Sequence, residues 1–119
     1  GSIKIGNNLS LNNNVMISSG NAGDITIGDN VLIGPNVVIR ASNHAYAEKD
    51  IPINKQGHIG GRVIIEDDVW IGANVVILPK AVIRKGAVVG AGSVVNSEIA
   101  GYSLAAGVPA KAVKNNMRR

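Results

Sequence analysis

The sequence predicts an all-β fold in which short parallel strands stack as the successive turns of a solenoid. Three observations support this prediction: an aliphatic residue recurs every six positions, a residue that tolerates a left-handed backbone follows most of these sites, and aromatic residues are scarce. The 119-residue chain has no Phe, one Trp and two Tyr, so its apolar volume must come from Ile, Val, Leu and Ala. A repetitive interior of stacked aliphatic side chains suits this composition better than a compact globule, whose core usually relies on aromatic residues.

The six-residue period is kept at twelve sites, each of which is Ile, Leu or Val. These sites are Ile5, Leu11, Ile17, Ile27, Ile33, Ile39, Ile65, Ile71, Ile77, Ile83, Val89 and Val95. Three residues after each site lies a corner position, and eight of the twelve are Asn or Gly, which adopt left-handed conformations most easily. The corner positions are Asn8, Asn14, Gly20, Asn30, Asn36, Ser42, Asp68, Asn74, Lys80, Gly86, Gly92 and Glu98. Neither a helix nor a plain strand has this period, and the alternative of a β-sandwich would give variable strand spacing.

The period is interrupted twice. Ile17 and Ile27 are ten residues apart instead of six, so about four residues are inserted there. Ile39 and Ile65 are twenty-six apart, so about twenty residues form a long excursion loop that contains both histidines, His44 and His58. Insertions in a solenoid emerge as surface loops, and a long loop is usually either functional or disordered. We expect a functional loop, because the segment is neither of low complexity nor highly charged.

We expect one domain over residues 1–119. The start Gly1-Ser2 lacks an initiator Met and resembles a tag remnant, so native N-terminal residues are expected to be missing. The absence of Cys agrees with a cytoplasmic location, and no apolar run approaches the roughly 20 residues that a membrane span needs, so we expect no stable membrane insertion.

The net charge of +4 is modest, but a short basic tail ends the chain. Lys111, Lys114, Arg118 and Arg119 fall within the last nine residues, with no acidic residue among them. Such a tail attracts nucleic acid, an anionic membrane surface or a phosphorylated ligand. Because no nucleic-acid-binding motif accompanies it, we expect no nucleic-acid partner.

Several motifs resemble one family over nearly the whole chain, from about Ile3 to Lys114. They are the hexads themselves, DDVWIGANVVILP at residues 67–79, GAVVGAGSVV at residues 86–95 and AAGVPAK at residues 105–111. These motifs resemble the hexapeptide-repeat acyltransferases, in particular the branch of sugar O-acetyltransferases that includes the maltose, galactoside and surface-polysaccharide enzymes. The resemblance implies a left-handed parallel β-helix with three hexads per turn. It also implies a homotrimer that binds acetyl-CoA in a cleft between neighbouring subunits.

The implied reaction moves an acetyl group from the thioester to a hydroxyl of a sugar or polysaccharide precursor. Such a transfer needs a base, and histidine suits this role because its ordinary pKa of about 6.5 lets it accept and return a proton near neutrality. His44, in SNHAYAE, matches the position of the family's catalytic His. Asn14 matches a family Asn that faces this His across the cleft, although the corner register alone also favours Asn there. His58 has no match, and we expect it to be structural or to line the acceptor pocket.

The resemblance also assigns residues to the acetyl-CoA site. Trp70, Gly72 and Ala73 match the segment beside the pantetheine arm, and the indole of Trp70 is expected to point outward. A backbone N–H near Ala73 is the candidate donor to the oxyanion, and loss of such a donor typically costs about 10² to 10³ in rate. Ala91 matches a position whose backbone contacts the CoA arm.

Lys111 and Lys114 match the basic positions that meet the nucleotide phosphates, where a Lys point charge suits a phosphate. A solvated basic tail is the plainer interpretation of the same residues. This chain departs from the branch at residues 96–98, which read Asn-Ser-Glu where the branch commonly has Thr-Lys-Asp. This departure affects the adenine end of the expected site.

Solenoids of this kind can also serve other functions. A γ-class carbonic anhydrase needs three histidines at zinc and the chain has two, so no metal is expected. An ice-binding solenoid needs Thr ladders, and Thr26 is the only Thr. An N-acetyltransferase acting on an amino-sugar, an antibiotic acetyltransferase and a non-catalytic trimeric scaffold remain open alternatives, and the sequence does not identify the acceptor.

Overall fold

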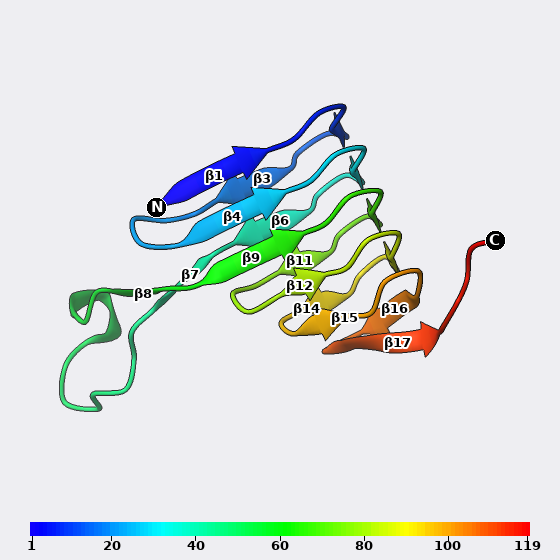
Figure 1. Ribbon diagram of the computed structural model, residues 1–119. Coiled ribbons are helices and arrows are strands. Elements are labelled where there is room, and N and C mark those ends of the chain that lie inside the picture. The colour runs from blue at the N-terminus through cyan, green and yellow to red at the C-terminus, as the bar shows by residue number, and fades with distance from the viewer.

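The computed structural model describes residues 1–119 and shows a left-handed parallel β-helix with three flat faces (Figure 1). Sheet A contains β1 (Ser2–Ile5), β4 (Asp24–Ile27), β9 (Arg62–Ile65), β12 (Val82–Ile83) and β15 (Glu98–Ile99), in that order. Sheet B contains β2 (Ser10–Leu11), β5 (Leu32–Ile33), β10 (Trp70–Ile71), β13 (Val88–Val89), β16 (Leu104–Gly107) and β17 (Ala110–Lys114). Sheet C contains β3 (Met16–Ser18), β6 (Val38–Arg40), β11 (Val76–Ile77) and β14 (Val94–Val95). The solenoid and its stacked parallel strands confirm the predicted fold class.

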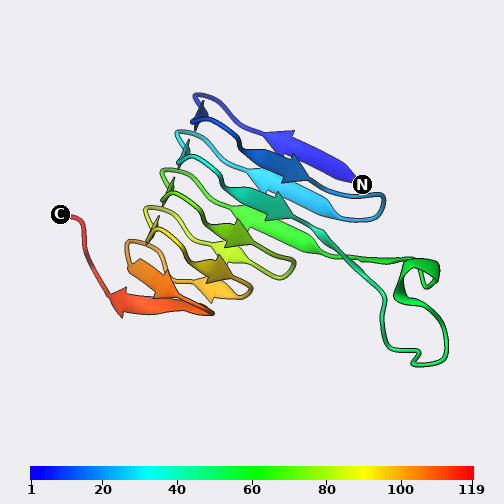
Figure 2. The ribbon, with the colours of Figure 1, turned by 180° about the vertical axis from the view of Figure 1, so that it is seen from behind.

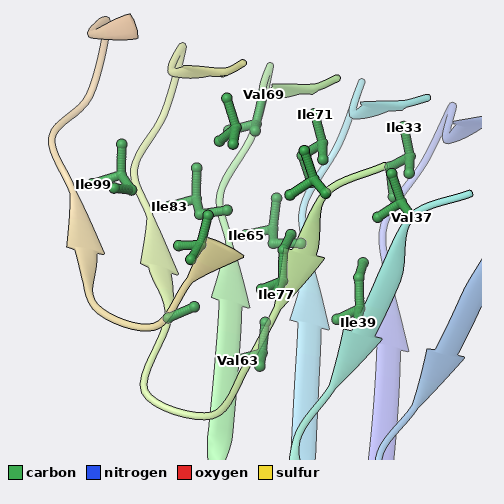
Figure 3. Packing of buried hydrophobic residues seen from close by; sticks show 14 of the residues in the cluster. Ile33, Val37, Ile39, Val63, Ile65, Val69, Ile71, Ile77, Ile83 and Ile99 are labelled. Atoms are coloured by element: carbon green, nitrogen blue, oxygen red, sulfur yellow. The ribbon is translucent and has the colours of Figure 1, made fainter. Parts of the chain in front are cut away.

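The aliphatic residues of the six-residue period stack directly above one another inside the coil. In sheet A, Ile27 pairs with Ile65, Ile65 with Ile83, and Ile83 with Ile99, and all four side chains are buried. Sheets B and C repeat this arrangement, so that the core is a column of aliphatic layers (Figure 3). Burying one such side chain stabilises the fold by about 1.5–3 kcal/mol, and each layer contacts only its neighbours.

The corners between the faces use left-handed backbone, as the sequence predicts. Ten of the twelve predicted corner positions have positive φ, including the non-glycine residues Asp68 (φ 58°) and Lys80 (φ 82°). Ser42 and Glu98 were predicted wrongly, because both lie in strands. At Ser42 the chain leaves the coil to form the excursion. Between Val95 and Ile99 the chain is two residues shorter than the regular six-residue spacing, so this corner differs from the others. Tyr102 (φ 54°) takes the left-handed conformation at the next corner.

Both interruptions of the period emerge at the same corner, between sheets C and A. The short one is a loop at residues 19–23. The long one is an antiparallel hairpin of β7 (Ser42–His44) and β8 (His58–Gly60), with a 3₁₀ helix η1 (Ile53–Lys55) in its tip. The hairpin projects away from the body of the solenoid, as both ribbon views show (Figure 2). The predicted excursion is therefore an ordered arm.

The two ends of the coil differ. At the C-terminal end β17 turns back and pairs antiparallel with β16, which covers the edge of sheet B. At the N-terminal end the large apolar side chains of Ile3, Ile5, Leu11 and Met16 are between 43% and 50% exposed. No helical segment is long and apolar enough to cross a membrane.

Candidate active site

His44 is the last residue of β7 and lies on the hairpin arm. Its imidazole is exposed and lines a surface depression with Tyr46, Ile59 and Lys80. Because Lys80 belongs to the corner between sheets C and A, this depression joins the root of the arm to the body of the coil. The structure therefore holds His44 at the edge of the coil where the arm begins.

The two histidines of the chain face each other across the hairpin. His44 pairs with His58 in the antiparallel ladder, and their ring centroids are 4.6 Å apart with the rings inclined at 39°. The prediction treated His58 as structural or pocket-lining and did not foresee this contact. The sequence indicated only that both residues lie in the same long insertion. It did not indicate which residues of the insertion pair with each other.

Gln56 organises the chain between the two hairpin strands. Its side-chain oxygen accepts from the backbone N–H of Glu48 (3.1 Å), and its amide nitrogen donates to the carbonyls of Glu48 (2.8 Å) and Ile51 (2.7 Å). These three hydrogen bonds stabilise a segment that has few ladder bonds of its own.

The root of the arm is packed tightly against the body. A Cβ on Gly60 would lie 2.1 Å from the carbonyl oxygen of Ala22, and a Cβ on Gly61 would lie 2.7 Å from Cβ of Pro79. Glycine is required at both positions because no larger residue fits without a shift of the backbone. The arm therefore leaves the coil in one fixed direction.

Four predicted site residues gather at a different edge, the corner between sheets B and C. Asn14 lies in the first turn of this corner, Ala73 in the third and Ala91 in the fourth, with Asn36 in the turn between Asn14 and Ala73. Gly72 precedes Ala73. A Cβ on Gly72 would lie 2.9 Å from the backbone nitrogen of Ala91, so the stacked turns are in close contact. Asn14 donates through its side-chain nitrogen to Oδ1 of Asn36 (2.9 Å).

The backbone N–H groups of Ala73 and Ala91 are free to bind a ligand. The neighbouring amides are used within the coil, since Gly72 donates to Val89, Asn74 to Pro35 and Gly92 to Ala73. Ala73 and Ala91 themselves donate to no acceptor in the chain. Ala73 is half-buried and Ala91 is exposed. A row of free amides along one corner can hold polar groups of an extended ligand.

The remaining predicted residues lie on sheet B. Trp70 opens β10, is 51% exposed and points outward as expected. Lys111 and Lys114 are exposed on β17 at the end of the same sheet, opposite Ala106 and Leu104 of β16. Sheet B and its corner with sheet C thus carry all six residues assigned to acetyl-CoA.

Comparison with known proteins agrees with this architecture. Residues 62–97 match the family model described as bacterial transferase hexapeptide (six repeats), and residues 24–41 match the hexapeptide repeat of succinyl-transferase. The chain is 38% identical over 115 residues to a probable acetyltransferase of Mycobacterium tuberculosis, covering 97% of this chain and 38% of that protein. It is 36% identical over 121 residues to a putative lipopolysaccharide biosynthesis O-acetyltransferase of Escherichia coli, covering 96% and 61%.

A solved structure extends the match to three dimensions. The crystal structure of a hexapeptide-repeat acetyltransferase from Vibrio cholerae, complexed with acetyl coenzyme A, superposes with a TM-score of 0.84 at 37% identity. The match covers 95% of this chain and 60% of that one. The chain carries the hexapeptide repeats of bacterial transferases over residues 24–41 and 62–97 and is similar to acetyltransferases that contain such repeats. The chain spans between about two fifths and three fifths of the length of these relatives.

In this hexapeptide-repeat protein, one chain does not bring all the predicted site residues together. Asn14 precedes β3 and lines a depression with Met16, Asn36 and Val38, whereas His44 follows β6 and lines a separate one. The strands of sheet C run from the corner with Asn14, Ala73 and Ala91 to the corner that carries the arm. His44 and the free amides therefore lie at opposite edges of sheet C.

The outer faces of this hexapeptide-repeat coil also differ in polarity. Sheet C presents the apolar ladder Met16, Val38, Val76 and Val94. Sheet A presents charged groups, among them an Arg84 guanidinium that pairs with Glu98 (2.7 Å) and Glu66 (3.1 Å).

Hydrogen bonds and charges perturb two groups on sheet A. Hydrogen bonds to Glu98 and then Glu66 raise the pKa of Arg84. A hydrogen bond from the Ser2 hydroxyl lowers the pKa of Asp24, with smaller contributions from nearby positive charges that include Arg62. The outer side of sheet A therefore carries ionised groups that are hydrogen-bonded to one another or to neighbouring side chains.

Proposed function

We propose that this protein is an acetyl-CoA-dependent O-acetyltransferase that acts on a hydroxyl of a sugar or polysaccharide precursor. The observation that carries the proposal is that the chain presents both an exposed imidazole on the arm and backbone amides without an acceptor along one corner of the coil. The E. coli relative is described as an O-acetyltransferase and the V. cholerae structure contains acetyl coenzyme A, which supports the same chemistry here.

His44 acts as the general base in this proposal. Its imidazole takes the proton from the acceptor hydroxyl as the hydroxyl oxygen attacks the thioester carbonyl. The carbon–sulfur bond then breaks, and the imidazolium returns the proton to the departing thiolate, so that the products are an acetyl ester and free CoA thiol. The imidazole is regenerated at the end of each turnover.

The backbone N–H of Ala73 donates to the carbonyl oxygen as negative charge develops on it. A fixed backbone donor of this kind does not have to reorient during the reaction, which is why such donors contribute strongly to the rate. Ala91 continues the row of free amides along the pantetheine arm, beside Gly72, and Trp70 flanks it on sheet B. Asn14 lies in the same row and would contact the acceptor.

Lys111 and Lys114 would meet the nucleotide phosphates beyond this row. Both lie on β17, at the end of sheet B, with exposed side chains. The Asn-Ser-Glu segment at residues 96–98 lies in the last corner between sheets C and A. It is therefore at a different edge from the lysines of its own chain.

The active site is proposed to form between subunits of a homotrimer. If three copies pack the apolar outer face of sheet C around a shared axis, the arm edge of each copy meets the amide edge of the next. Heterologous contacts of this kind generate closed rings. The arrangement brings His44 of one copy to Ala73 and Asn14 of its neighbour, which a single chain cannot do.

Replacement of His44 by Ala tests the base. We expect kcat to fall by about 10² to 10⁴ with little change in the KM for acetyl-CoA, because the imidazole acts in the transition state. Release of CoA thiol would be measured with a panel of sugars and nucleotide-sugars. A loss of tenfold or less would remove His44 as the base.

The class of acceptor can be read from the same reaction. Hydroxylamine cleaves acetyl esters and leaves acetyl amides intact, so we expect treatment of the labelled product to release the acetyl group. A resistant product would identify the N-acetyltransferase alternative. Failure to bind acetyl-CoA at millimolar concentration would instead favour a non-catalytic scaffold.

A further inference from the structure

The contact between His44 and His58 is set by the backbone register of the arm. The backbone N–H of Ala45 donates to the carbonyl of Gly57 (3.0 Å), which makes the next pair, His44 and His58, a non-hydrogen-bonded pair. In antiparallel ladders such pairs bring their side chains closest together, on one face of the hairpin. The separation of 4.6 Å between the ring centroids is therefore built into the strand pairing.

No hydrogen bond orients the imidazole of His44. All side-chain hydrogen bonds within the arm are made by Gln56, and none reaches either imidazole. A catalytic base normally needs a third group that holds its ring in a productive orientation. An exposed side chain without such a group samples several rotamers. The ring of His58 is the group in contact with His44.

The backbone that carries the two rings is itself fixed. Gly60 packs against the carbonyl of Ala22 at the root of the arm, and Gln56 bonds to the backbone of Glu48 and Ile51 near the tip. His58 lies between these two anchored points, so the backbone that carries its ring is held beside His44.

We infer that His58 is a positioning residue, which holds the imidazole of His44 in the orientation that the acceptor hydroxyl requires. This inference rests on the proposed role of His44 as the base. Because the two residues belong to the same arm, His58 would act within one subunit, whereas the thioester is held by the neighbouring one. Its contribution is packing of the ring face, which an aromatic residue without titratable nitrogens can also supply.

Two substitutions at His58 and one control test this role. His58→Ala removes the ring, and we expect about a tenfold lower kcat with an unchanged KM for acetyl-CoA, because misplacement of a reacting group slows the chemical step. His58→Phe keeps a planar ring, and we expect kcat within about twofold of the unsubstituted protein and the same pH–rate profile. Lys55→Ala, on the exposed 3₁₀ helix of the arm, should leave both constants unchanged.

A second measurement does not depend on turnover. The ring-proton NMR signals of His44 should shift in His58→Ala and remain close to their original positions in Lys55→Ala, because only the first removes a neighbouring ring. Retained signals in His58→Ala would show that the rings are not in contact in solution and would overturn the inference.

The kinetic outcomes also separate the possible failures. If His58→Phe is as slow as His58→Ala, the nitrogens of His58 matter and the packing role is wrong. If His58→Ala keeps full kcat, His58 does not position the base. If His44→Ala also keeps full activity while the NMR contact is present, the proposed function of His44 fails and the contact itself stands.

Discussion

Gly86 and Gly92 occupy corners of the coil with nearly the same backbone, at φ +75° and +76°, and differ in what surrounds them. A Cβ on Gly86 would lie 2.3 Å from the ring of Tyr102, whereas a Cβ on Gly92 would meet nothing within 4 Å. The guanidinium of Arg118 lies 5.9 Å from the centroid of the Tyr102 ring and pairs with Asp68 (2.5 Å). Two glycines with nearly the same φ therefore differ in what an added side chain would meet.

Alanine at these two positions separates backbone strain from steric overlap. Gly92→Ala should reduce the free energy of unfolding by about 1 kcal/mol, the cost of a left-handed conformation for an L-residue. Gly86→Ala carries the same cost and must also displace the Tyr102 ring, so we expect a loss larger by a further 1–2 kcal/mol or so. Urea unfolding of the two variants measures the difference, and equal losses would show that Tyr102 moves aside freely.

At the scale of single residues, the sequence predicts those positions at which the backbone conformation restricts the residue type. The corner positions could be predicted because left-handed backbone favours Asn and Gly, and the outward direction of Trp70 followed from its position in the hexad. The contact between His44 and His58 could not be predicted, because it depends on a hairpin register that no periodic pattern encodes. Resemblance pointed to the backbone of Ala73 and Ala91, but the sequence does not show which backbone N–H groups lack an acceptor, since every residue except Pro has one.

The arm is the element that departs most from the regular coil. Its strands have three residues each, and an isolated hairpin of this size is marginally stable in water. The arm therefore depends on the packing of Gly60 and Gly61 at its root and on the hydrogen bonds of Gln56. Its length and position could be predicted from the break in the period, but its ordered structure depends on these tertiary contacts.

Removal of the Gln56 side chain should loosen the arm without affecting the coil. In Gln56→Ala we expect faster amide hydrogen exchange at Glu48, lower kcat and an unchanged midpoint of thermal unfolding, because the lost bonds lie outside the core. Asn54→Ala is the matched control, since Asn54 lies in the same tip and its side chain makes no hydrogen bond. A fall in the thermal midpoint of Gln56→Ala would show that the arm and the coil unfold together.

On the scale of the whole molecule, the three faces of the coil are unequal. The outer ladder of sheet C is aliphatic, whereas sheet A has the ion pairs of Arg84 with Glu66 and Glu98. A contiguous apolar ladder on an outer face can mark a contact with another protein surface. The proposed trimer covers the apolar face and leaves the charged one in water.

A lysine substitution on the outer face of sheet C, compared with one on the outer face of sheet A, tests this arrangement. Val76 and Val82 occupy the same position in successive hexads, and both are half-buried on the outer side of a strand, Val76 on sheet C and Val82 on sheet A. Light scattering should give three times the 12.3 kDa chain mass for the unsubstituted protein and for Val82→Lys. Val76→Lys should give monomers and lose activity, because a buried unpaired charge is strongly unfavourable at an interface. A trimeric Val76→Lys would exclude sheet C from the interface.

The fold and family could be predicted from the sequence because the same physical requirement is repeated in nearly every hexad. One ambiguous residue changes little when twelve equivalent sites give the same pattern. The candidate site is the opposite case, because each of its residues occurs once and its two halves lie at different edges of the coil. Its residues could be proposed from resemblance, but their separation within one chain became visible only in three dimensions.

The antiparallel return of β17 fixes how far its lysines lie from the amide of Ala73. Strands in sheet B are about 4.8 Å apart, and β10, β13, β16 and β17 follow one another in that order. In the proposed site, the distance between the thioester carbon, at Ala73, and the phosphates, at the lysines of β17, is therefore set by a whole number of strand spacings. Removal of one turn of the coil would shorten this distance by one strand spacing. A ligand of fixed covalent length could then no longer contact the Ala73 amide and the lysines at the same time.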